Sequence, residues 1–404
     1  MIVRRSENLA PVHSDIRGPL YVESQRMAKE GIKVLRMNTG NPAAFGFGMP
    51  DSVRNALLAN ADKAVAYCDL KGMPEAREAI CAYHKGKGVR DITPEDIYIG
   101  NGVSELVLMC LLALCNKGDE ILVPSPSYSL WSNSAYIAGG RPVFYACDES
   151  GGWFPDVSDI RKKITKRTRA IVVINPNNPT GAVYPKEVLL DIAQAARENG
   201  LIIFADEIYD RLLMDGAEHY SIAALAPDLM VVTTNGLSKS HIICGFRCGW
   251  MCVSGYKGKA EDYMEGIFQL AAMRLCANAL TQLVIPAALA DDASTKAMLV
   301  PGGRLYEQRE VTFRELAKID GLTCVKNRAA FYAFPKVDVK KFNITSDRQF
   351  ALDLLHEKHI LMVPGSGFDM PAPDHFRIVM LPEPQEMEQA MKDLGDFLRH
   401  YKQA

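Results

Sequence analysis

Several features that would place a protein in a specialised class are missing from this 404-residue sequence. Its formal net charge is only −2, so no excess of basic residues favours nucleic acid or an anionic membrane as a partner. No apolar run is long enough to span a bilayer, and residues 1–8 lack the uninterrupted apolar stretch of a signal peptide. Hydrophobic residues make up 48% of the chain and charged residues 23%, as in an ordinary globular protein. We therefore expect a cytoplasmic protein whose partners include neither nucleic acid nor a membrane.

Short catalytic and metal-binding signatures are missing as well. The sequence has no HExxH, no Walker loop, no GxSxG elbow and no GxGxxG fingerprint. Its ten cysteines are scattered through apolar segments, which is typical of reduced, buried thiols rather than of a disulfide framework. Cys244, Cys248 and Cys252 recur every fourth residue, but residues 248–254 have the pattern of a strand, and no His or fourth Cys nearby completes a tetrahedral set. We predict buried packing for these three cysteines and no metal site.

What the sequence does contain is a series of short apolar runs that alternate with amphipathic helical patterns. Continuous apolarity is typical of strands that are covered on both faces. The predicted strands span residues 96–100, 120–124, 142–146, 170–175, 201–206, 230–234 and 249–253. Helical patterns such as 105–116 and 187–199 lie between them, each followed by a glycine. This predicts a doubly wound α/β layer structure with a mainly parallel sheet of about seven strands.

The pattern changes after about residue 290. A charged helical stretch over 304–319 is followed by short strand-like pieces at 323–326, 330–334 and 376–380, and then by a final helix. We predict a large domain over residues 41–290. Residues 1–40 and 291–404 are expected to form a smaller α+β domain together.

A lysine and an arginine follow one of the predicted strands. Lys239 comes after the apolar run that starts at Val231, and Arg247 returns eight residues later past Gly245. A lysine at the exit of a buried strand with an arginine beside it suits an amine that forms an imine next to an anchored phosphate. Pyridoxal 5′-phosphate (PLP) needs that pair. For this segment alone, a loop with two solvated basic residues is an equally good interpretation.

Further polar residues follow other predicted strands, and ligands of doubly wound sheets bind at the carboxyl ends of strands. Gly102, Val103 and Ser104 open a helix, whose N-terminus favours an anion, although an N-capped turn explains them equally well. Tyr128 follows Pro124-Ser-Pro126, where its ring has a position to stack on a flat ligand or simply to pack in the loop.

The next two strand ends carry an amide and a carboxylate. Asn178 lies in the rigid run Asn175-Pro-Asn-Asn-Pro-Thr-Gly181, which fixes the direction of its amide, unless the run is only a reverse turn. Asp206 ends a buried strand, which is costly unless the carboxylate meets a cation such as a protonated pyridine nitrogen, or caps a helix. Tyr209 is placed to hydrogen-bond a ring oxygen. Taken together, these residues indicate a PLP site.

On these residues the chain resembles the class I aminotransferases, PLP enzymes with the aspartate-aminotransferase fold. The resemblance runs from about Leu35 to Arg377, and its most specific parts are Asn178-Pro-Thr-Gly181 and Ser238-Lys239 with Gly245-Phe-Arg247. It implies that Lys239 carries the internal aldimine and that Asp206 pairs with the pyridine nitrogen. It also implies that Tyr209 and Asn178 bind O3′ of the cofactor.

The same resemblance assigns the phosphate, the substrate and the assembly. Arg247 and the turn at Gly102, Val103 and Ser104 are implied to hold the phosphate. Because Gly236 stands where much of the family has a phosphate-binding Ser or Thr, Ser104 or Ser238 is expected to substitute. Tyr67 is similar to the tyrosine that reaches the phosphate of a neighbouring subunit, which implies a homodimer with shared active sites. Arg377 is implied to clamp the substrate α-carboxylate with Asn178 beside it, and Gly40 to close over the substrate.

Three shorter segments resemble the bacterial alanine (glutamate–pyruvate) aminotransferases, namely Ile16–Pro19, Met273–Asn278 and Ala330–Pro335. They imply a ping-pong reaction of L-alanine with 2-oxoglutarate that gives pyruvate and L-glutamate. Two points stay unassigned. The segment His241–Cys244 is more apolar than this branch suggests, and Arg274 lies one residue from the second carboxylate clamp of aspartate-specific members.

Other functions fit the same cofactor. A C–S β-lyase, a cyclopropane-forming synthase, or an aminotransferase for other aliphatic or aromatic amino acids would use the same fold. A non-catalytic PLP-binding regulator is an alternative of another class. Such regulators usually carry an added DNA-binding helix-turn-helix, for which this chain has neither the length nor a basic N-terminal domain.

Overall fold

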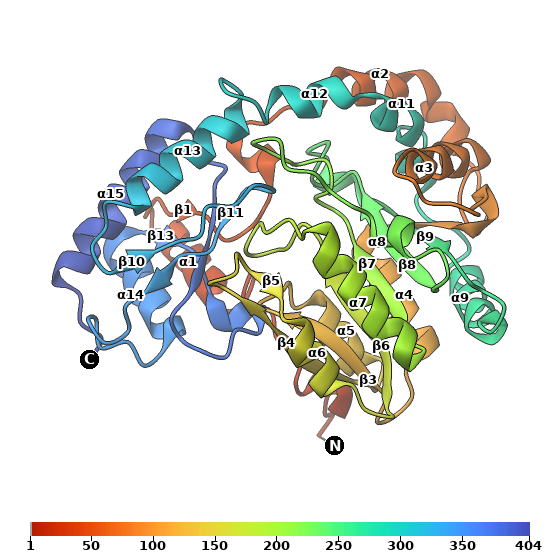
Figure 1. The fold of residues 1–404 in the computed structure, drawn as a ribbon. Helices are drawn as coiled ribbons and strands as arrows, with labels where there is room; N and C mark the ends of the chain where they lie inside the picture. The colour runs from red at the N-terminus through yellow and green to blue at the C-terminus, as the bar shows by residue number, and fades with distance from the viewer. Residues whose placement is uncertain (1) are drawn as a thin grey trace.

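A mixed sheet of eight strands forms the centre of the computed structural model, which describes residues 2–404 (Figure 1). In spatial order the strands are β2 (Ile97–Asn101), β9 (Cys248–Ser254), β8 (Val231–Gly236), β7 (Ile202–Asp206), β6 (Thr168–Ile174), β3 (Glu120–Ser125), β4 (Arg141–Asp148) and β5 (Phe154–Pro155). The run from β8 to β4 is parallel, whereas β9 is antiparallel to both of its neighbours and β5 is antiparallel to β4. All seven predicted strands and the mainly parallel order are confirmed. The eighth strand was missed because β5 has only two residues, too few for any apolar pattern.

Helices cover both faces of this sheet, which explains why its strands are apolar at successive positions. Ala170 and Val172 of β6 share a core with α4 (Val103–Leu114), α5 (Leu130–Ile137) and α9 (Glu261–Met273). Ile171 and Val173 point to the other face, where they share a core with α3 (Pro74–Gly86), α6 (Val157–Lys163), α7 (Lys186–Asn199) and α8 (Ile222–Leu225). The predicted helices over 105–116 and 187–199 correspond to α4 and α7. Further helices are α2 (Asp51–Asn60), α10 (Ala279–Gln282), α11 (Ile285–Ala290) and α12 (Asp292–Ala297).

A second body of structure combines the start of the chain with its end. In Figure 1 the red elements α1 (Pro19–Lys29) and β1 (Leu35–Arg36) lie among the blue C-terminal elements. Strand β1 pairs in parallel with β13 (Ile360–Leu361), and the shared core includes α13 (Arg304–Leu316), α14 (Asp347–Lys358) and α15 (Pro384–His400). Tyr209, Leu212 and Ile242 from loops of the large sheet pack in the same core. The domain limits at residues 40 and 290 therefore remain a proposal.

The strands of this second body are short. They are β10 (Leu322–Thr323), β11 (Tyr332–Ala333), β12 (Lys336–Val337), β14 (Val363–Pro364) and β15 (Phe376–Val379). Strands β11, β15 and β14 form one small sheet, and β10 pairs with β12. The predicted pieces at 323–326, 330–334 and 376–380 overlap β10, β11 and β15, but each strand is shorter than predicted. Between residues 2 and 404, no helix combines the length and the apolarity needed to cross a membrane.

Candidate active site

A cavity of about 680 Å³ opens where the central strands of the large sheet end and the second body begins. This volume lies within the range of small-molecule sites. The predicted site residues that line it are Gly40, Val103, Ser104, Tyr128, Asn178, Asp206, Tyr209, Ser238, Lys239, Arg247 and Arg377. Gly102 is not part of the lining, but it directly precedes Val103. Tyr67 is a second exception, because its side chain does not line the cavity and is 81% exposed.

Lys239 follows β8 after a two-residue link and reaches into the cavity. Its Nζ donates a hydrogen bond to the carbonyl oxygen of Gly40 at 2.9 Å. Within the described part of the chain, residues 2–404, Lys239 forms no ion pair with a carboxylate. The amine is therefore held in place by one neutral acceptor, which leaves it available to an incoming electrophile.

Asp206, the last residue of β7, is only 5% exposed. Its carboxylate accepts hydrogen bonds from Trp131 Nε1 at 3.2 Å and from the backbone N–H of Ile208 at 3.3 Å. Burial raises the pKa of Asp206 to about 6, against the opposing effect of these donors. A cationic group in the cavity would offset that cost, so Asp206 fits a protonated ring nitrogen. Trp131 was not predicted, although a buried tryptophan in a helix beside Tyr128 needs an acceptor for its N–H.

Tyr209 and Asn178 each have one well-defined partner. The hydroxyl groups of Tyr209 and Tyr332 lie 2.8 Å apart, and the two rings meet edge to face. Burial raises the pKa of Tyr209 well above its usual value, so the phenol stays protonated and able to donate. Asn178 Oδ1 accepts a hydrogen bond from Arg377 Nη1 at 2.9 Å, and this bond directs the amide NH₂ of Asn178. Tyr332 lies in the segment Ala330–Pro335, which resembles the alanine aminotransferases, but no role was predicted for it.

Arg377 in β15 is a buried cation that lines the same cavity, with 1% of its surface exposed. Its guanidinium lies between the rings of Tyr332 and Phe368, with its central carbon 4.5 and 4.6 Å from their centroids. Besides Asn178, it donates to the carbonyl oxygen of Asn38, while its buried Nε has no acceptor among residues 2–404. Burial lowers the pKa of Arg377, and no described carboxylate compensates the charge. The side chain fits a planar anion such as a substrate carboxylate.

The N-terminus of α4 and Arg247 converge on a third part of the site. Gly102 has φ = 84°, and a Cβ atom there would lie 2.4 Å from Arg247 Nη2, so only glycine allows the two to approach. Backbone N–H groups at a helix N-terminus together with a guanidinium suit a phosphate. A Cβ atom at Gly236 would lie 2.6 Å from the carbonyl oxygen of Cys248. This contact explains why no Ser or Thr stands at position 236.

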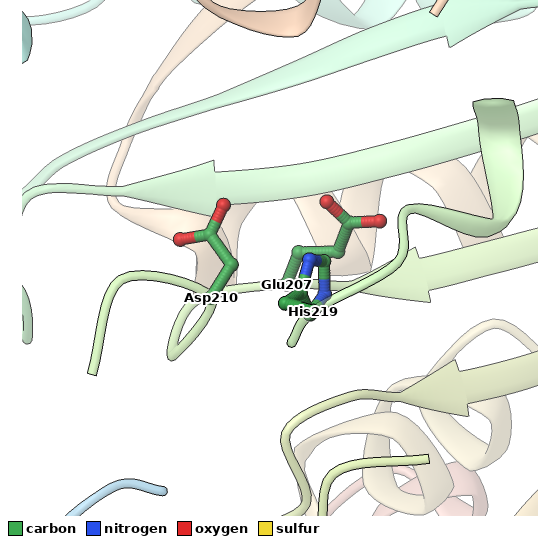
Figure 2. A group of neighbouring side chains, drawn as sticks. All are labelled: Glu207, Asp210 and His219. Carbon is green, nitrogen blue, oxygen red and sulfur yellow. The ribbon is translucent and has the colours of Figure 1, made fainter. Parts of the chain in front are cut away.

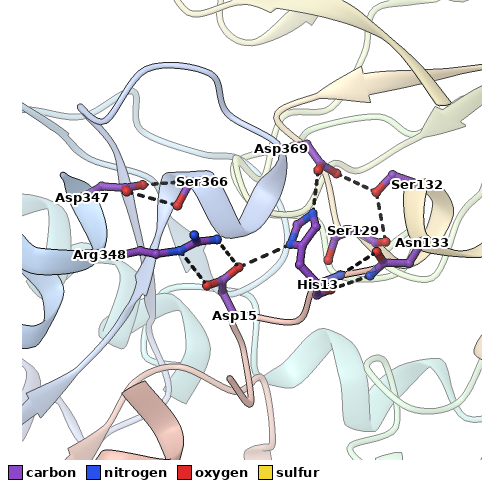
Figure 3. Close-up of polar contacts among 9 residues, drawn as sticks. All are labelled: His13, Asp15, Ser129, Ser132, Asn133, Asp347, Arg348, Ser366 and Asp369. Carbon is purple, nitrogen blue, oxygen red and sulfur yellow. Dashed lines mark hydrogen bonds and ion pairs between the residues drawn. The ribbon is translucent and has the colours of Figure 1, made fainter. Parts of the chain in front are cut away.

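The segment just before α1 also lines the cavity, through Ser14, Ile16 and Arg17, none of which was predicted as a site residue. Figure 3 shows how His13 fastens it. His13 Nε2 lies 3.0 Å from Asp369 Oδ1 and its Nδ1 lies 3.4 Å from Asp15 Oδ2.

Two further contacts complete this attachment. The backbone of His13 exchanges hydrogen bonds with the side chain of Asn133 in α5, and Arg348 in α14 binds Asp15 at 3.1 and 3.2 Å. The segment is therefore fixed to both bodies of the structure.

The unassigned segments also have local roles. Arg274 forms an ion pair with Glu105 and donates to the carbonyl oxygen of Ile99 at 2.6 Å, outside the cavity. His241 is buried against the carbonyl oxygen of Ala288 at 2.6 Å.

The cysteine prediction holds for two of its three residues. Cys248 and Cys252 are buried in β9, as predicted. Cys244 is only partly buried and lines the cavity, because β9 begins after it, so the prediction of core packing was wrong for this residue.

Comparison with known proteins shows the family of this chain. Residues 32–394 match the family model described as aminotransferase class I and II. The chain belongs to this family. The aminotransferase is 52% identical to the glutamate-pyruvate aminotransferase AlaA of Haemophilus influenzae, over 99% of each chain.

Solved structures agree with this assignment. The fold matches the crystal structure of an aminotransferase from Escherichia coli with a TM-score of 0.99 at 51% identity, covering 100% of both chains. It matches the alanine aminotransferase from Pyrococcus furiosus with a TM-score of 0.92 at 38% identity, covering 98% of this chain and 100% of that one. The predicted family and α/β fold are confirmed.

Proposed function

We propose that this aminotransferase binds PLP and transfers the amino group of L-alanine to 2-oxoglutarate, which yields pyruvate and L-glutamate. One observation carries the proposal. Asp206 and Arg377 are buried groups of opposite charge, each without an ionic partner in residues 2–404, and both face the cavity that contains Lys239. A ligand with a ring cation at one end and a carboxylate at the other compensates both. The similarity to alanine and glutamate-pyruvate aminotransferases supports the choice of amino acid.

Different residues of the cavity would bind different parts of the cofactor. Lys239 would hold its aldehyde carbon, Asp206 its ring nitrogen, and the NH₂ of Asn178 with the hydroxyl of Tyr209 its phenolic oxygen. Tyr128 has the position to stack on the ring. The phosphate would lie at Gly102, Val103, Ser104, Ser238 and Arg247.

Tyr67 would complete the phosphate site from a second copy of the chain. Its side chain is 81% exposed, and the apolar side chains of Val65 and Met273 are 88% and 78% exposed. A hydrogen bond from Arg274 to the carbonyl oxygen of Leu70 joins these two segments. Exposed apolar patches of this kind mark protein interfaces. We therefore propose a homodimer in which Tyr67 serves the partner's active site.

The chain's own groups supply the proton transfers. When bound, PLP withdraws electrons from the α-carbon of the attached amino acid. Arg377 holds the α-carboxylate, which fixes the direction of the Cα–H bond. Once the substrate amine has taken its place, Lys239 would accept the α-proton on Nζ as general base and then, as general acid, donate it to the cofactor carbon that carried the aldehyde. Burial and the hydrogen bond to Tyr332 both raise the pKa of Tyr209, so its phenol would stay protonated.

The second substrate carries an extra carboxylate, and the cavity contains one cation that is still unused. Lys239, Arg247 and Arg377 have roles above. The remaining cation, Arg17, lines the cavity and forms no ion pair with any residue from 2 to 404. A guanidinium binds a carboxylate well. Arg17 is therefore our assignment for the distal carboxylate of glutamate and 2-oxoglutarate, which alanine lacks.

We also propose a cytoplasmic location, since all ten cysteines are free.

The visible absorption of the purified, PLP-supplemented protein tests the proposal. We expect a band from the lysine-bound cofactor that fades when alanine or glutamate is added singly and returns with pyruvate or 2-oxoglutarate. Lys239→Ala should lack the band, whereas Lys85→Ala, a surface lysine, should keep it. A band that survives Lys239→Ala would rule out the cofactor assignment. Fading with aspartate or tyrosine but not alanine would reject only the substrate, and steady ammonia release without a 2-oxo acid would indicate a β-lyase.

A further inference from the structure

A second charged cluster lies beside the active site, on the same strand ends but outside its cavity. Figure 2 shows three of its members, Glu207, Asp210 and His219, grouped next to the sheet. One ligand atom from each lies within 4.8 Å of the others. The side chains of Glu207 and Asp210 are only 2% exposed. Two buried carboxylates in one place need a positive charge between them.

The composition of this cluster is that of a metal site, but the chain supplies its own cation there. Lys87, which directly follows α3, places its Nζ at hydrogen-bond distance from Glu207 Oε2 and 2.6 Å from Asp210 Oδ2. The Lys87 side chain is only 16% exposed. Burial alone would lower the pKa of Lys87, but the charges of Asp210 and Glu207 outweigh it and raise the pKa, so the ammonium stays charged. Lys87 thus supplies the positive charge that the two buried carboxylates need.

The hydrogen bonds of this cluster join segments that carry the active-site groups. In the loop after β7, Glu207 directly follows Asp206, and Asp210 directly follows Tyr209. Asp210 Oδ2 also accepts from Asn235 Nδ2 at 2.8 Å, and Asn235 lies four residues before Lys239. Tyr83 in α3 donates to the same oxygen at 2.5 Å.

A third loop joins through His219. Its Nε2 lies 3.0 Å from the carbonyl oxygen of Asn175, at the start of the rigid run that holds Asn178. Burial lowers the pKa of His219, and the charge of Lys87 lowers it further, so the ring stays neutral. The titratable and charged groups around Lys87 are Tyr83, His84, Glu207, Asp210, Arg211 and His219.

We infer that Lys87 is a positioning residue, which holds the loop after β7 against the end of β8 in the arrangement that directs Asp206 and Lys239 into one cavity. It acts without touching the cavity, since neither Lys87 nor its two carboxylate partners line it. It also balances the charge of Glu207, the residue next to Asp206, and the negative charge of Glu207 raises the pKa of Asp206. The inference rests on the proposed use of PLP.

The test is the affinity of the cofactor-free protein for PLP across pH, with melting temperature recorded in parallel. Lys87→Met should weaken PLP binding roughly tenfold or more, the effect typical of residues that position direct ligands. It should also move the pH midpoint of binding upward by about one unit, because Glu207 is left unbalanced beside Asp206. Lys87→Arg should restore both values.

The matched control is Lys85→Met, the same substitution two residues away on an exposed position of α3. It should leave affinity and midpoint unchanged. Glu207→Gln provides a second variant, since it keeps one carboxylate for Lys87 and should fold even if Lys87→Met does not. It should move the midpoint downward, opposite to Lys87→Met, which a purely structural role would not do.

Each outcome decides the question. If folded Lys87→Met binds PLP with the affinity and midpoint of Lys85→Met, the inference is wrong. If Lys87→Met does not fold and Glu207→Gln keeps the wild-type midpoint, it is equally wrong. If the wild-type protein does not bind PLP at all, the proposed function fails, and that result differs from both others.

Discussion

Two lysines beside the same strand ends, Lys239 and Lys87, have opposite surroundings. Lys239 faces a cavity, and its amine meets only the carbonyl oxygen of Gly40. Lys87 lies outside that cavity, and its amine meets two buried carboxylates. An amine that is free of anions is available for covalent chemistry, whereas one held by two carboxylates is committed to holding structure. The placement of carboxylates therefore distinguishes the two lysines: the amine without a carboxylate is free to react, and the amine with two carboxylates stabilises the structure.

The largest effect expected from this comparison is on catalysis. Lys239→Ala should lower the rate of transamination by at least the order of 10⁴-fold, the upper range for loss of a general acid–base group. The cofactor-free variant should unfold in urea within about 0.5 kcal/mol of the wild type, because only one hydrogen bond is lost. Single-turnover kinetics and urea titration measure the two values. A large loss of stability would mean that Lys239 is also structural and would remove the contrast.

The next effect is on stability. Lys87→Met leaves two carboxylates buried without a cation, and breaking such a pair costs about 3–5 kcal/mol. Urea unfolding of the cofactor-free protein should show this loss, while Lys85→Met should stay within about 0.5 kcal/mol of the wild type. If Lys87→Met and Lys85→Met unfold at the same urea concentration, the buried ion pairs of Lys87 do not stabilise the fold. Lys87 would then not have the structural role that separates it from Lys239.

Arg17, a third cation without a carboxylate partner, sharpens the comparison. Arg17→Gln should raise the KM for glutamate and 2-oxoglutarate roughly 10- to 100-fold, since a hydrogen bond to a charged group contributes about 1.5–3 kcal/mol. The half-reactions with alanine and pyruvate should be unchanged, because these substrates have no distal carboxylate. Separate half-reaction kinetics measure this. An equal loss for both substrate pairs would show that Arg17 shapes the cavity in general.

The smallest effect concerns His13, whose charge fastens the segment that carries Arg17. Hydrogen bonds to Asp15 and Asp369 raise the pKa of His13 from 6.5 to about 9 in the folded protein. A raised pKa of this kind stabilises the fold fully below pH 6.5, and the stabilisation disappears as pH rises through about 9. The melting-temperature difference between wild type and His13→Gln should follow that course. A difference that is constant from pH 6 to 10 would contradict it.

The large sheet and the groups at its strand ends were predictable from sequence. Strands covered on both faces are apolar at every position, and parallel strands end on one edge of a sheet. Polar residues directly after such strands, such as Asp206, Asn178 and Lys239, are thereby brought together before any distance is known. The two-residue strand β5 and the short strands of the second body carry no such pattern.

The supporting contacts were not predictable in the same way. Trp131 meets Asp206 across 75 residues of sequence, and Tyr332 meets Tyr209 across 123. Lys87 reaches Glu207 across 120 residues, from the end of a helix whose sequence is otherwise ordinary. Which side chains meet across such separations depends on the packing of helices against the sheet, which no local pattern specifies.

The pairing of β1 with β13 also constrains the order of events during synthesis. Leu35 aligns with Ile360, so 360 − 35 = 325 residues must be translated after Leu35 before its partner exists. At a translation rate of about 5–20 residues per second, β1 has no partner strand for roughly 16–65 s. Throughout that time Leu20 and Met27, which are buried in the finished protein, have no core to enter. The start of this chain is therefore among the last parts to fold. Until the C-terminal helices emerge, nascent-chain chaperones have to shield its apolar residues.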